Sequence, residues 1–267
     1  MMDFLLSTVS ANNACFRYLR FGKGSRNFVI IPGLSIKSVL DSAPVIVGGF
    51  ARFADDFTVY LIERRKDPPE GFKISDLAED EAAAMKALGI ESTDIFGASL
   101  GGIMAQYIAL DPPELVHAAV LASTTPQFDR AKIEFFGSLL ELAVEGRGEE
   151  LFLAFAEFVY SEGFLKRYKS AISAIAKSVT ADELGHFVKV ARAFSEFDIT
   201  DRLPAVKCPV LAVGATGDRI LGAGPMKTIA EKIPGSQSLI YEGGSHACYD
   251  EEPGFRARMY EFLKSQK

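Results

Sequence analysis

The segment Thr93–Gly102 reads TDIFGASLGG and decides the fold. Its first part, Thr93–Phe96, has the composition of a strand, and the apolar stretch Leu100–Leu110 predicts a buried helix. Between them, Gly97–Gly101 matches the pattern G-x-S-x-G. A serine on such a sharp strand-to-helix turn lies beside the unpaired N–H groups of a helix N-terminus. We therefore predict that Ser99 is a nucleophile, with a simple helix N-cap as the alternative.

Short apolar runs of this kind alternate with helical patterns along the chain. This alternation predicts an α/β fold, with a mostly parallel central sheet flanked by helices. Several runs are continuously apolar, as buried parallel strands tend to be. The other predicted strands are Ala14–Phe21, Asn27–Ile31, Phe57–Ile62, Ala118–Ala122, Val210–Gly214 and Ser238–Tyr241. The other predicted helices of this part are Ser75–Leu88 and Phe255–Lys264.

Residues 126–200 break the alternation, because they show helical patterns and no convincing strand. We predict that residues 1–125 and 201–267 form the α/β core and that residues 126–200 form a helical insertion. Ten of the 21 Phe residues lie in the insertion. We expect most of them to fill its core and some to line an apolar pocket. The predicted helices are Arg130–Val144, Glu149–Val159, Gly163–Lys177 and Asp182–Phe197.

A serine hydroxyl needs a base to become a good nucleophile, and histidine suits this task near neutral pH. The chain has three histidines. His117 lies at the entrance of a strand, opposite the carboxyl ends where α/β sites form. His186 lies in the insertion, where we expect a partly exposed helix residue. His246 follows the strand Ser238–Tyr241 on a loop with two glycines, and we predict that it is the base.

The imidazole needs a carboxylate that fixes its tautomer and stabilises the cation. Asp218 follows the strand Val210–Gly214 in a glycine-flanked loop, and we predict that it has this role. The order Ser99, Asp218, His246 agrees with a nucleophile followed by acid and base. Asp129 is the alternative acid, although it lies several residues beyond the end of a strand.

Acyl transfer also requires donors for the negative charge that develops on the carbonyl oxygen. The backbone N–H of Leu100, next to the nucleophile, is one predicted donor. Leu34, in the loop Pro32-Gly33-Leu34-Ser35, is the other, with the Ser35 hydroxyl or a plain Pro-Gly turn as alternatives. The candidate residues of the substrate pocket are Ser35, Ile36, Val39, Phe128, Phe135, Phe136 and Phe155.

The 267-residue chain has a formal net charge of −6. No dense basic patch is present, so we expect a small-molecule substrate and no nucleic acid. The run Arg64-Arg65-Lys66 is short and precedes acidic residues, so we expect a solvated turn. The cysteines Cys15, Cys208 and Cys248 form no disulfide framework and no metal-ligand spacing, so we expect no metal and no cofactor.

The N-terminal sequence MMDFLLSTVS has no cationic start, and no apolar run approaches the roughly 18 residues that span a bilayer. We therefore expect a cytoplasmic protein that does not enter a membrane. Composition leaves the oligomeric state open.

These residues together resemble the α/β-hydrolase superfamily over nearly the whole chain. The shared segments are Ile31–Leu34, Gly97–Gly102, Leu121–Ser123, Cys208–Leu211, Gly217-Asp218 and Gly244–His246. The resemblance implies the same roles for Ser99, Asp218, His246, Leu34 and Leu100 that the residues themselves suggest. It also implies that residues 126–200 form a helical cap over the site.

Two departures from the family pattern lie near the expected pocket. Many relatives have His-Gly where this chain has Pro32-Gly33, and many have His where it has Ala98. Neither position takes part in the chemistry, so these two departures bear only on the subfamily to which the chain is assigned. The serine at position 99 argues against haloalkane dehalogenases and epoxide hydrolases, which use aspartate there.

The sequence thus predicts a carboxylic-ester hydrolase that works through an acyl-enzyme. The same three residues could instead cleave an amide, a thioester or a carbon–carbon bond, or could serve a perhydrolase or a lyase. A ligand-binding protein with a silent site is the alternative outside catalysis. The residues that support Ser99 serve the chemistry and do not identify the acyl group or the leaving group.

Overall fold

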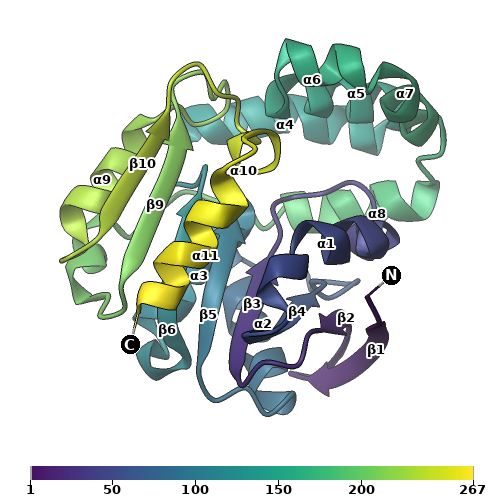
Figure 1. Ribbon diagram of the computed structural model, residues 1–267. Helices are drawn as coiled ribbons and strands as arrows, with labels where there is room; N and C mark the ends of the chain where they lie inside the picture. The colour runs from purple at the N-terminus through teal and green to yellow at the C-terminus, as the bar shows by residue number, and fades with distance from the viewer. Residues whose placement is uncertain (1, 267) are drawn as a thin grey trace.

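The computed structural model describes residues 2–266 (Figure 1). An eight-stranded sheet has the order β1-β2-β4-β3-β5-β6-β9-β10. The strands from β4 to β10 in this order are parallel, whereas β2 is antiparallel to both β1 and β4. The strands are β1 (Phe4–Ala11), β2 (Ala14–Phe21), β3 (Arg26–Ile31), β4 (Phe57–Ile62), β5 (Thr93–Ala98), β6 (Val116–Ala122), β9 (Val210–Ala215) and β10 (Gln237–Tyr241).

The predicted α/β architecture is confirmed, and each predicted strand is present within two residues of its predicted ends. The strand β1 was not among the predicted strands. This strand lies at the edge of the sheet and is only partly covered, so it lacks the continuous apolar pattern of the inner strands. Asn12 and Asn13, both with positive φ, form the tight hairpin that joins it to β2.

Helices cover both faces of the sheet and divide the core into two layers. In β3, Val29 and Ile31 point into one layer, whereas Phe28 and Ile30 point into the other. The first layer is covered by α2 (Ile74–Ala87), α3 (Leu100–Leu110) and α9 (Gly224–Lys232). The second is covered by α1 (Ala43–Gly49) and α11 (Phe255–Ser265), which crosses the sheet in Figure 1.

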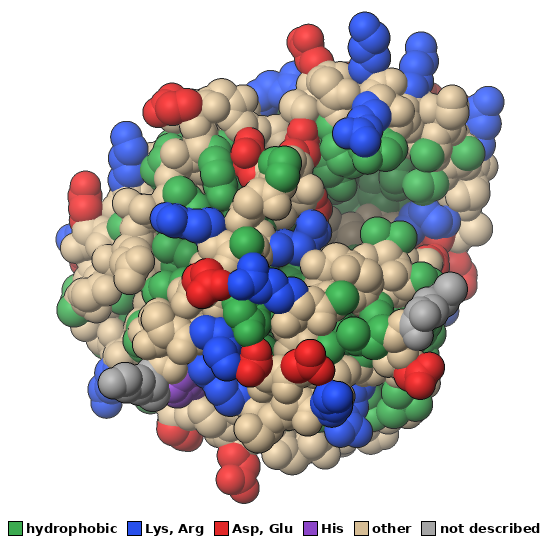
Figure 2. Space-filling view, in the orientation of Figure 1, with side chains coloured by type: hydrophobic (Ala, Val, Ile, Leu, Met, Phe, Trp, Pro, Cys, Tyr) green, Lys and Arg blue, Asp and Glu red, His purple; other side chains and the backbone are tan. Residues whose placement is uncertain are grey.

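The region between β6 and β9 contains five α-helices, and α4–α7 lie together beyond the carboxyl edge of the sheet (Figure 1). Figure 2 shows that the surface is hollowed below α5 and α7, with hydrophobic side chains along the upper wall. The elements of this region are β7 (Gln127–Phe128), α4 (Arg130–Val144), α5 (Gly148–Val159), α6 (Glu162–Arg167), α7 (Lys169–Lys177), α8 (Ala181–Ala191) and β8 (Phe197–Asp198).

Two helix predictions in this region were wrong in extent. The predicted helix Gly163–Lys177 is two helices, because the backbone leaves the helical region at Tyr168. The predicted helix Asp182–Phe197 ends at Ala191. Beyond that point Phe197 pairs with Phe128 in a two-residue ribbon, and their rings stack at a centroid distance of 6.2 Å. The expectation that this region contains no strand was therefore also wrong.

The three cysteines are free thiols, Cys15 exposed and the other two buried. Within residues 2–266, no helix is both long and apolar enough to cross a membrane.

Candidate active site

Ser99 occupies the sharp turn between β5 and α3. Its backbone has φ +52° and ψ −118°, a region that non-glycine residues rarely adopt. Every residue from Thr93 through Gln106 is buried except Ser99, which is partly exposed. Within residues 2–266, its side chain makes no capping hydrogen bond to α3, so a side-chain cap does not explain this serine. The turn therefore places one hydroxyl at the surface of an otherwise buried segment.

The glycines around Ser99 are required by close backbone contacts. A Cβ atom at Gly101 would lie 2.0 Å from the carbonyl oxygen of Ile31, at the end of β3. A Cβ atom at Gly97 would lie 2.6 Å from the carbonyl oxygen of Gly101. Only glycine lets α3 begin this close to the sheet. The G-x-S-x-G pattern thus reflects how tightly the turn is packed against β3.

His246 and Asp218 form a buried pair on the loops after β10 and β9. The distance from His246 Nδ1 to Asp218 Oδ2 is 2.8 Å, and both side chains are almost fully buried. The other carboxylate oxygen accepts hydrogen bonds from the N–H groups of Ile220 and Leu221, at 2.8 and 3.0 Å. Because the Asp218 carboxylate accepts a hydrogen bond from Nδ1, it favours the tautomer in which Nδ1 carries the proton and Nε2 the lone pair. The pair is thus arranged so that Nε2 can act as a base.

Neighbouring residues connect Ser99 to the histidine loop. The Ser99 N–H donates to the carbonyl oxygen of Ala122, at the end of β6. The next residue, Ser123, contacts the Cys248 thiol at 3.7 Å, two residues beyond His246. Within residues 2–266, no hydrogen bond joins the Ser99 hydroxyl to His246 directly. Catalytic hydrogen bonds often tighten only in the reacting complex, so proton transfer requires the two groups to approach to about 3 Å.

The other histidines have different surroundings. His117 lies at the amino end of β6, with Nδ1 2.9 Å from Asp94 Oδ1 and 3.3 Å from an Arg26 nitrogen. His186 lies on α8, with Nδ1 2.9 Å from the carbonyl oxygen of Lys66, and burial lowers its pKa. Neither histidine shares a loop cluster with Ser99, and the role of His246 as the base stays a prediction.

Asp129, the alternative acid, caps α4. Its carboxylate accepts from the Lys132 backbone N–H at 3.0 Å and from the Lys132 ammonium at 2.8 Å. These contacts lower the pKa of Asp129, because they stabilise the charged form.

Within the described residues, no group of His, Cys, Asp and Glu side chains could hold a metal ion.

The loop after β3 lies directly against the candidate nucleophile. A Cβ atom at Gly33 would lie 3.2 Å from Ser99 Cβ and 3.9 Å from Ser99 Oγ. Leu34 follows Gly33, and Leu100 is the first residue of α3. Among the described residues, neither the Leu34 nor the Leu100 N–H donates to a protein acceptor outside a helix or strand. Their role as donors to an oxyanion stays a prediction.

The expectation that Arg64-Arg65-Lys66 forms a solvated turn was wrong for the two arginines. Arg64 donates to the carbonyl oxygens of Pro32 and Gly33, each at 2.8 Å. Arg65 forms an ion pair with the buried carboxylate of Asp80, with one contact at 2.7 Å. A run of charges after a strand resembles a surface turn in sequence. The signal that was overlooked is position, because Arg64 follows the carboxyl end of β4 just as Ser99 follows that of β5.

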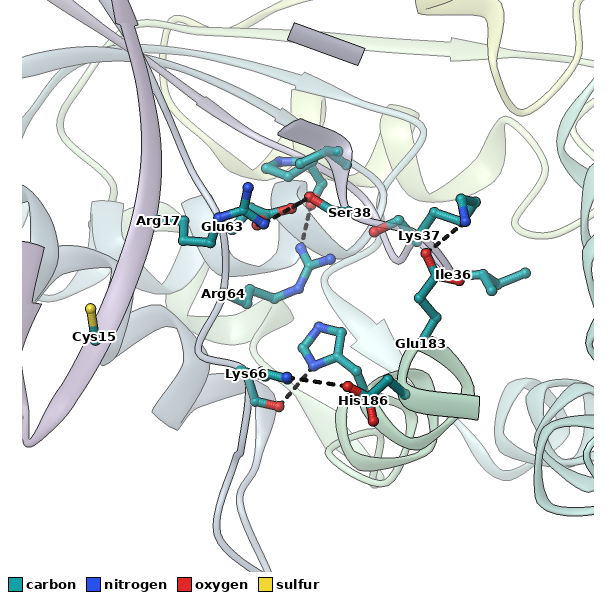
Figure 3. A pocket seen from close by; sticks show the side chains of 14 residues that line it. Cys15, Arg17, Ile36, Lys37, Ser38, Glu63, Arg64, Lys66, Glu183 and His186 are labelled. Carbon is teal, nitrogen blue, oxygen red and sulfur yellow. Dashed lines mark hydrogen bonds and ion pairs between the residues drawn. The ribbon is translucent and has the colours of Figure 1, made fainter. Parts of the chain in front are cut away.

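A cavity of about 450 Å³ lies beside the loop after β3 (Figure 3). It is lined by Ser35, Ile36 and Val39, three of the predicted pocket residues, but not by Ser99. The cavity is therefore adjacent to the candidate nucleophile rather than over it. Figure 3 shows Lys37 paired with Glu183 of α8 across this space, at 2.6 Å. The other ionisable lining residues are Arg17, Glu63, Arg64, Lys66, Asp182 and His186.

The four predicted pocket phenylalanines lie in aromatic clusters of the insertion. Phe128 is 2% exposed, and its ring lies 5.7 Å from that of Phe136. Phe135 makes an edge contact with Phe136 at 5.3 Å, and Phe155 makes one with Phe187 at 6.4 Å. These contacts belong to packing within the insertion. A role for these rings in substrate binding stays a prediction.

The insertion is bonded directly to the loops that carry Asp218 and His246. Arg219, next to Asp218, donates to the carbonyl oxygens of Glu157 and Tyr160 at the end of α5. The N–H of Ala247, next to His246, donates to the Val159 carbonyl oxygen at 2.9 Å. Glu251, on α10 (Cys248–Glu251), accepts from both Ser161 and Ser245. Both loops therefore depend on the junction between α5 and α6.

Comparison with known proteins assigns this architecture to a family. The family model described as alpha/beta hydrolase fold matches residues 62–253, which is more than half of the chain. The protein therefore belongs to the alpha/beta-hydrolase fold family, a family of hydrolytic enzymes. The resemblance stated from the sequence motifs is confirmed.

Individual relatives are distant in sequence but close in structure. A Rhizobium rhizogenes protein named "Putative carbamate hydrolase RutD" is 27% identical over 223 residues, covering 80% of this chain and 85% of that protein. The enol-lactonase from Burkholderia xenovorans LB400 superposes with a TM-score of 0.84 at 18% identity, covering 97% of this chain and all of that one. The hydrolase MGS-M2, from a Medee basin deep-sea metagenome library, superposes with a TM-score of 0.86 at 18% identity, covering 98% of both chains. These structural likenesses show the shared fold.

Proposed function

We propose that the protein is a serine hydrolase that cleaves a small carboxylic ester through an acyl-enzyme intermediate. The observation that carries the proposal is the pairing of one partly exposed serine at a strained turn with a buried His246–Asp218 pair at the same sheet edge. In this proposal Ser99 is the nucleophile, His246 the general base and Asp218 the residue that orients the imidazole.

The chemical steps follow from these roles. His246 Nε2 takes the hydroxyl proton while Ser99 Oγ attacks the carbonyl carbon, and the carbonyl π electrons move to oxygen. Collapse of this intermediate expels the alkoxide, which takes the proton from the imidazolium. Water then attacks the acyl group with His246 again as base, and Ser99 leaves and recovers its proton. Asp218 stabilises the imidazolium in both halves of the cycle.

The backbone N–H groups of Leu34 and Leu100 are the proposed donors to the oxyanion. A single such donor contributes about 3 kcal/mol to transition-state stabilisation in comparable sites. The contact between Gly33 and Ser99 supports this assignment, because it brings the peptide of Leu34 beside the nucleophile.

We further propose that residues 126–200 act as a cap and that the protein is cytoplasmic. The bonds from α5 and α6 to the loops of Asp218 and His246 support the cap assignment. The lining of the 450 Å³ cavity by Ser35, Ile36 and Val39 supports their place next to a bound substrate. The free cysteines support a reducing compartment.

A carbamate is the second candidate substrate, because the relative at 27% identity carries that name. A carbamate has the same electrophilic carbonyl as an ester, so the same three residues could attack it. Cleavage of an amide, a thioester or a carbon–carbon bond would begin with the same attack of Ser99 on a carbonyl carbon and would differ in the leaving group. Perhydrolysis would differ in the final acyl acceptor, which is peroxide instead of water.

The test is a substrate panel with matched serine variants. We expect hydrolysis of p-nitrophenyl acetate to exceed that of the matching carbamate, anilide, thioester and lactone. Ser99→Ala should lower kcat by about 10⁴-fold or more. Ser92→Ala, at the amino end of the same strand, is exposed and far from the site, and it should keep full activity.

Retention of esterase activity by Ser99→Ala would contradict the proposal. Faster turnover of the carbamate would favour the second candidate. Peracid formation in the presence of peroxide, at the expense of hydrolysis, would identify a perhydrolase. Failure of a fluorophosphonate to label the protein, together with no turnover of any substrate, would identify a binding protein.

A further inference from the structure

Arg64 is the charged residue closest to the proposed oxyanion loop that the mechanism above does not use. It lies two residues beyond the end of β4, and its guanidinium turns back toward the loop after β3 (Figure 3). Nη1 donates to the Pro32 carbonyl oxygen and Nη2 to the Gly33 carbonyl oxygen, each at 2.8 Å. The planar fork of arginine suits two neighbouring acceptors in a way that an ammonium does not.

These two bonds fix the direction of the Leu34 N–H. The Gly33–Leu34 peptide is trans, so its C=O and N–H point in opposite directions within one plane. Because Arg64 holds the Gly33 carbonyl oxygen, the Leu34 N–H points away from the guanidinium. Gly33 itself lies against Ser99. The peptide plane that Arg64 orients is therefore the one beside the nucleophile.

The residue before Arg64 holds the other end of the same loop. Glu63 Oε1 accepts from the Ser38 hydroxyl at 2.5 Å and from the Leu40 N–H at 3.5 Å. Glu63 and Arg64 are consecutive and follow a fully buried strand. The segment from Pro32 to Leu40 is thus attached at both ends to the rigid end of β4.

The positive charge of Arg64 also acts on this peptide. A hydrogen bond from a cation polarises the carbonyl group, which strengthens the N–H of the same unit as a donor. The acid nearest Arg64 from α2 is Glu81, and burial raises its pKa to about 8. Glu63 also acts electrostatically on Arg64, whereas burial lowers the pKa of the Arg64 guanidinium.

We propose that Arg64 is a positioning residue of the oxyanion hole, which aligns and polarises the Gly33–Leu34 peptide so that the Leu34 N–H stabilises the tetrahedral intermediate. This role rests on the proposed function of Ser99. Arg64 contacts no reacting atom and acts entirely through the peptide that it holds.

The test compares Arg64→Met and Arg64→Lys with Arg65→Met, using p-nitrophenyl acetate as substrate and an aryl trifluoromethyl ketone as a transition-state analogue. Arg65 is the matched control, because it is also a buried, paired arginine at the end of β4 but contacts Asp80 and Asn12 instead of the loop. Arg64→Met should lower kcat by about 10- to 100-fold, with KM changed by less than about threefold. The Ki of the ketone, whose adduct bears an oxyanion, should rise by the same factor as kcat falls. Arg64→Lys, which keeps the charge but donates to one carbonyl at a time, should lie between Arg64→Met and wild type.

Three results would overturn the role. The first is an equal loss of kcat in Arg64→Met and Arg65→Met, which would indicate a general loss of stability. The second is a fall in kcat with no change in the Ki of the ketone. The third is full activity in Arg64→Met. If Arg64→Met does not fold, Arg64→Lys provides the test. Its fall in kcat should then be matched by an equal rise in the Ki of the ketone. A failure of the proposed function shows itself separately, because Ser99→Ala would then keep the wild-type activity.

Discussion

The two halves of the candidate active site are held in place by different parts of the molecule. The nucleophile side comprises the loops after β3, β4 and β5, which carry Leu34, Arg64 and Ser99. Close backbone contacts and the two hydrogen bonds of Arg64 hold these loops together. The proton-transfer side comprises the loops after β9 and β10, which carry Asp218 and His246, and it is bonded to the insertion. In the proposed mechanism, the groups that stabilise the charge on the carbonyl oxygen are therefore held by the sheet and its loops.

This difference has a consequence for catalysis. The position of the base depends on how α5 and α6 are docked, whereas the position of the nucleophile does not. In the proposed mechanism, the Ser99 hydroxyl and His246 Nε2 must come within hydrogen-bonding distance before the proton is transferred. We therefore expect changes in the docking of the insertion to affect His246 and Asp218 more than Ser99.

The largest expected effect comes from the proton-transfer side. Asp218→Asn should lower kcat by about 10⁴-fold, because an amide favours the wrong imidazole tautomer and does not stabilise the cation. Labelling of Ser99 by a fluorophosphonate should slow by a comparable factor. Steady-state kinetics and labelling rates measure the two effects, and near-wild-type kcat in this variant would remove Asp218 from the mechanism.

The next effect is the pH dependence of stability caused by Glu81, a buried acid near Arg64 on the nucleophile side. The folded-state pKa of Glu81, about 8, lies above its ordinary value of 4.5, because burial penalises the charged form and outweighs the attraction of Arg64. The folded protein thus binds a proton that the unfolded chain releases between about pH 5 and pH 8. The stability due to the neutral carboxyl is complete below pH 5 and is lost as the pH rises through 8.

Urea unfolding at several pH values measures this effect. Relative to Glu81→Gln, the wild type should lose about 3–4 kcal/mol of unfolding free energy between pH 5 and pH 8. The glutamine variant keeps the shape of the side chain and cannot titrate, so it provides the reference. Parallel pH profiles for the two proteins would show that Glu81 is already charged in the folded state.

The smallest effect tests the link between the insertion and the proton-transfer side. Arg219→Met removes the donor to Glu157 and Tyr160, and it should lower kcat by about 3- to 10-fold, with a loss of about 1 kcal/mol of stability. Arg147→Met, which removes a surface ion pair within the insertion, is the control and should change neither quantity. Equal kinetics for the two variants would mean that the docking contacts do not position the base.

Much of the α/β core was predictable because its inner strands are continuously apolar and its turns carry conspicuous glycines. The pairing of Asp218 with His246 followed from the rule that sites gather at the carboxyl ends of parallel strands. The role of Arg64 was not predictable from composition, because a charged dipeptide after a strand looks the same whether it turns outward or inward. The break between α6 and α7 at Tyr168 and the pairing of Phe197 with Phe128 beyond α8 are features of the folded insertion that the helical pattern does not show.

Trapping of the acyl-enzyme tests the central assignment most directly. The protein is mixed with p-nitrophenyl acetate, quenched with acid within the first turnover, digested and analysed by mass spectrometry. We predict an added acetyl mass on the peptide that contains Ser99, and its absence in Ser99→Ala but not in Ser92→Ala. Turnover of the ester with no acyl adduct at Ser99, or with the adduct at another residue, would contradict the account.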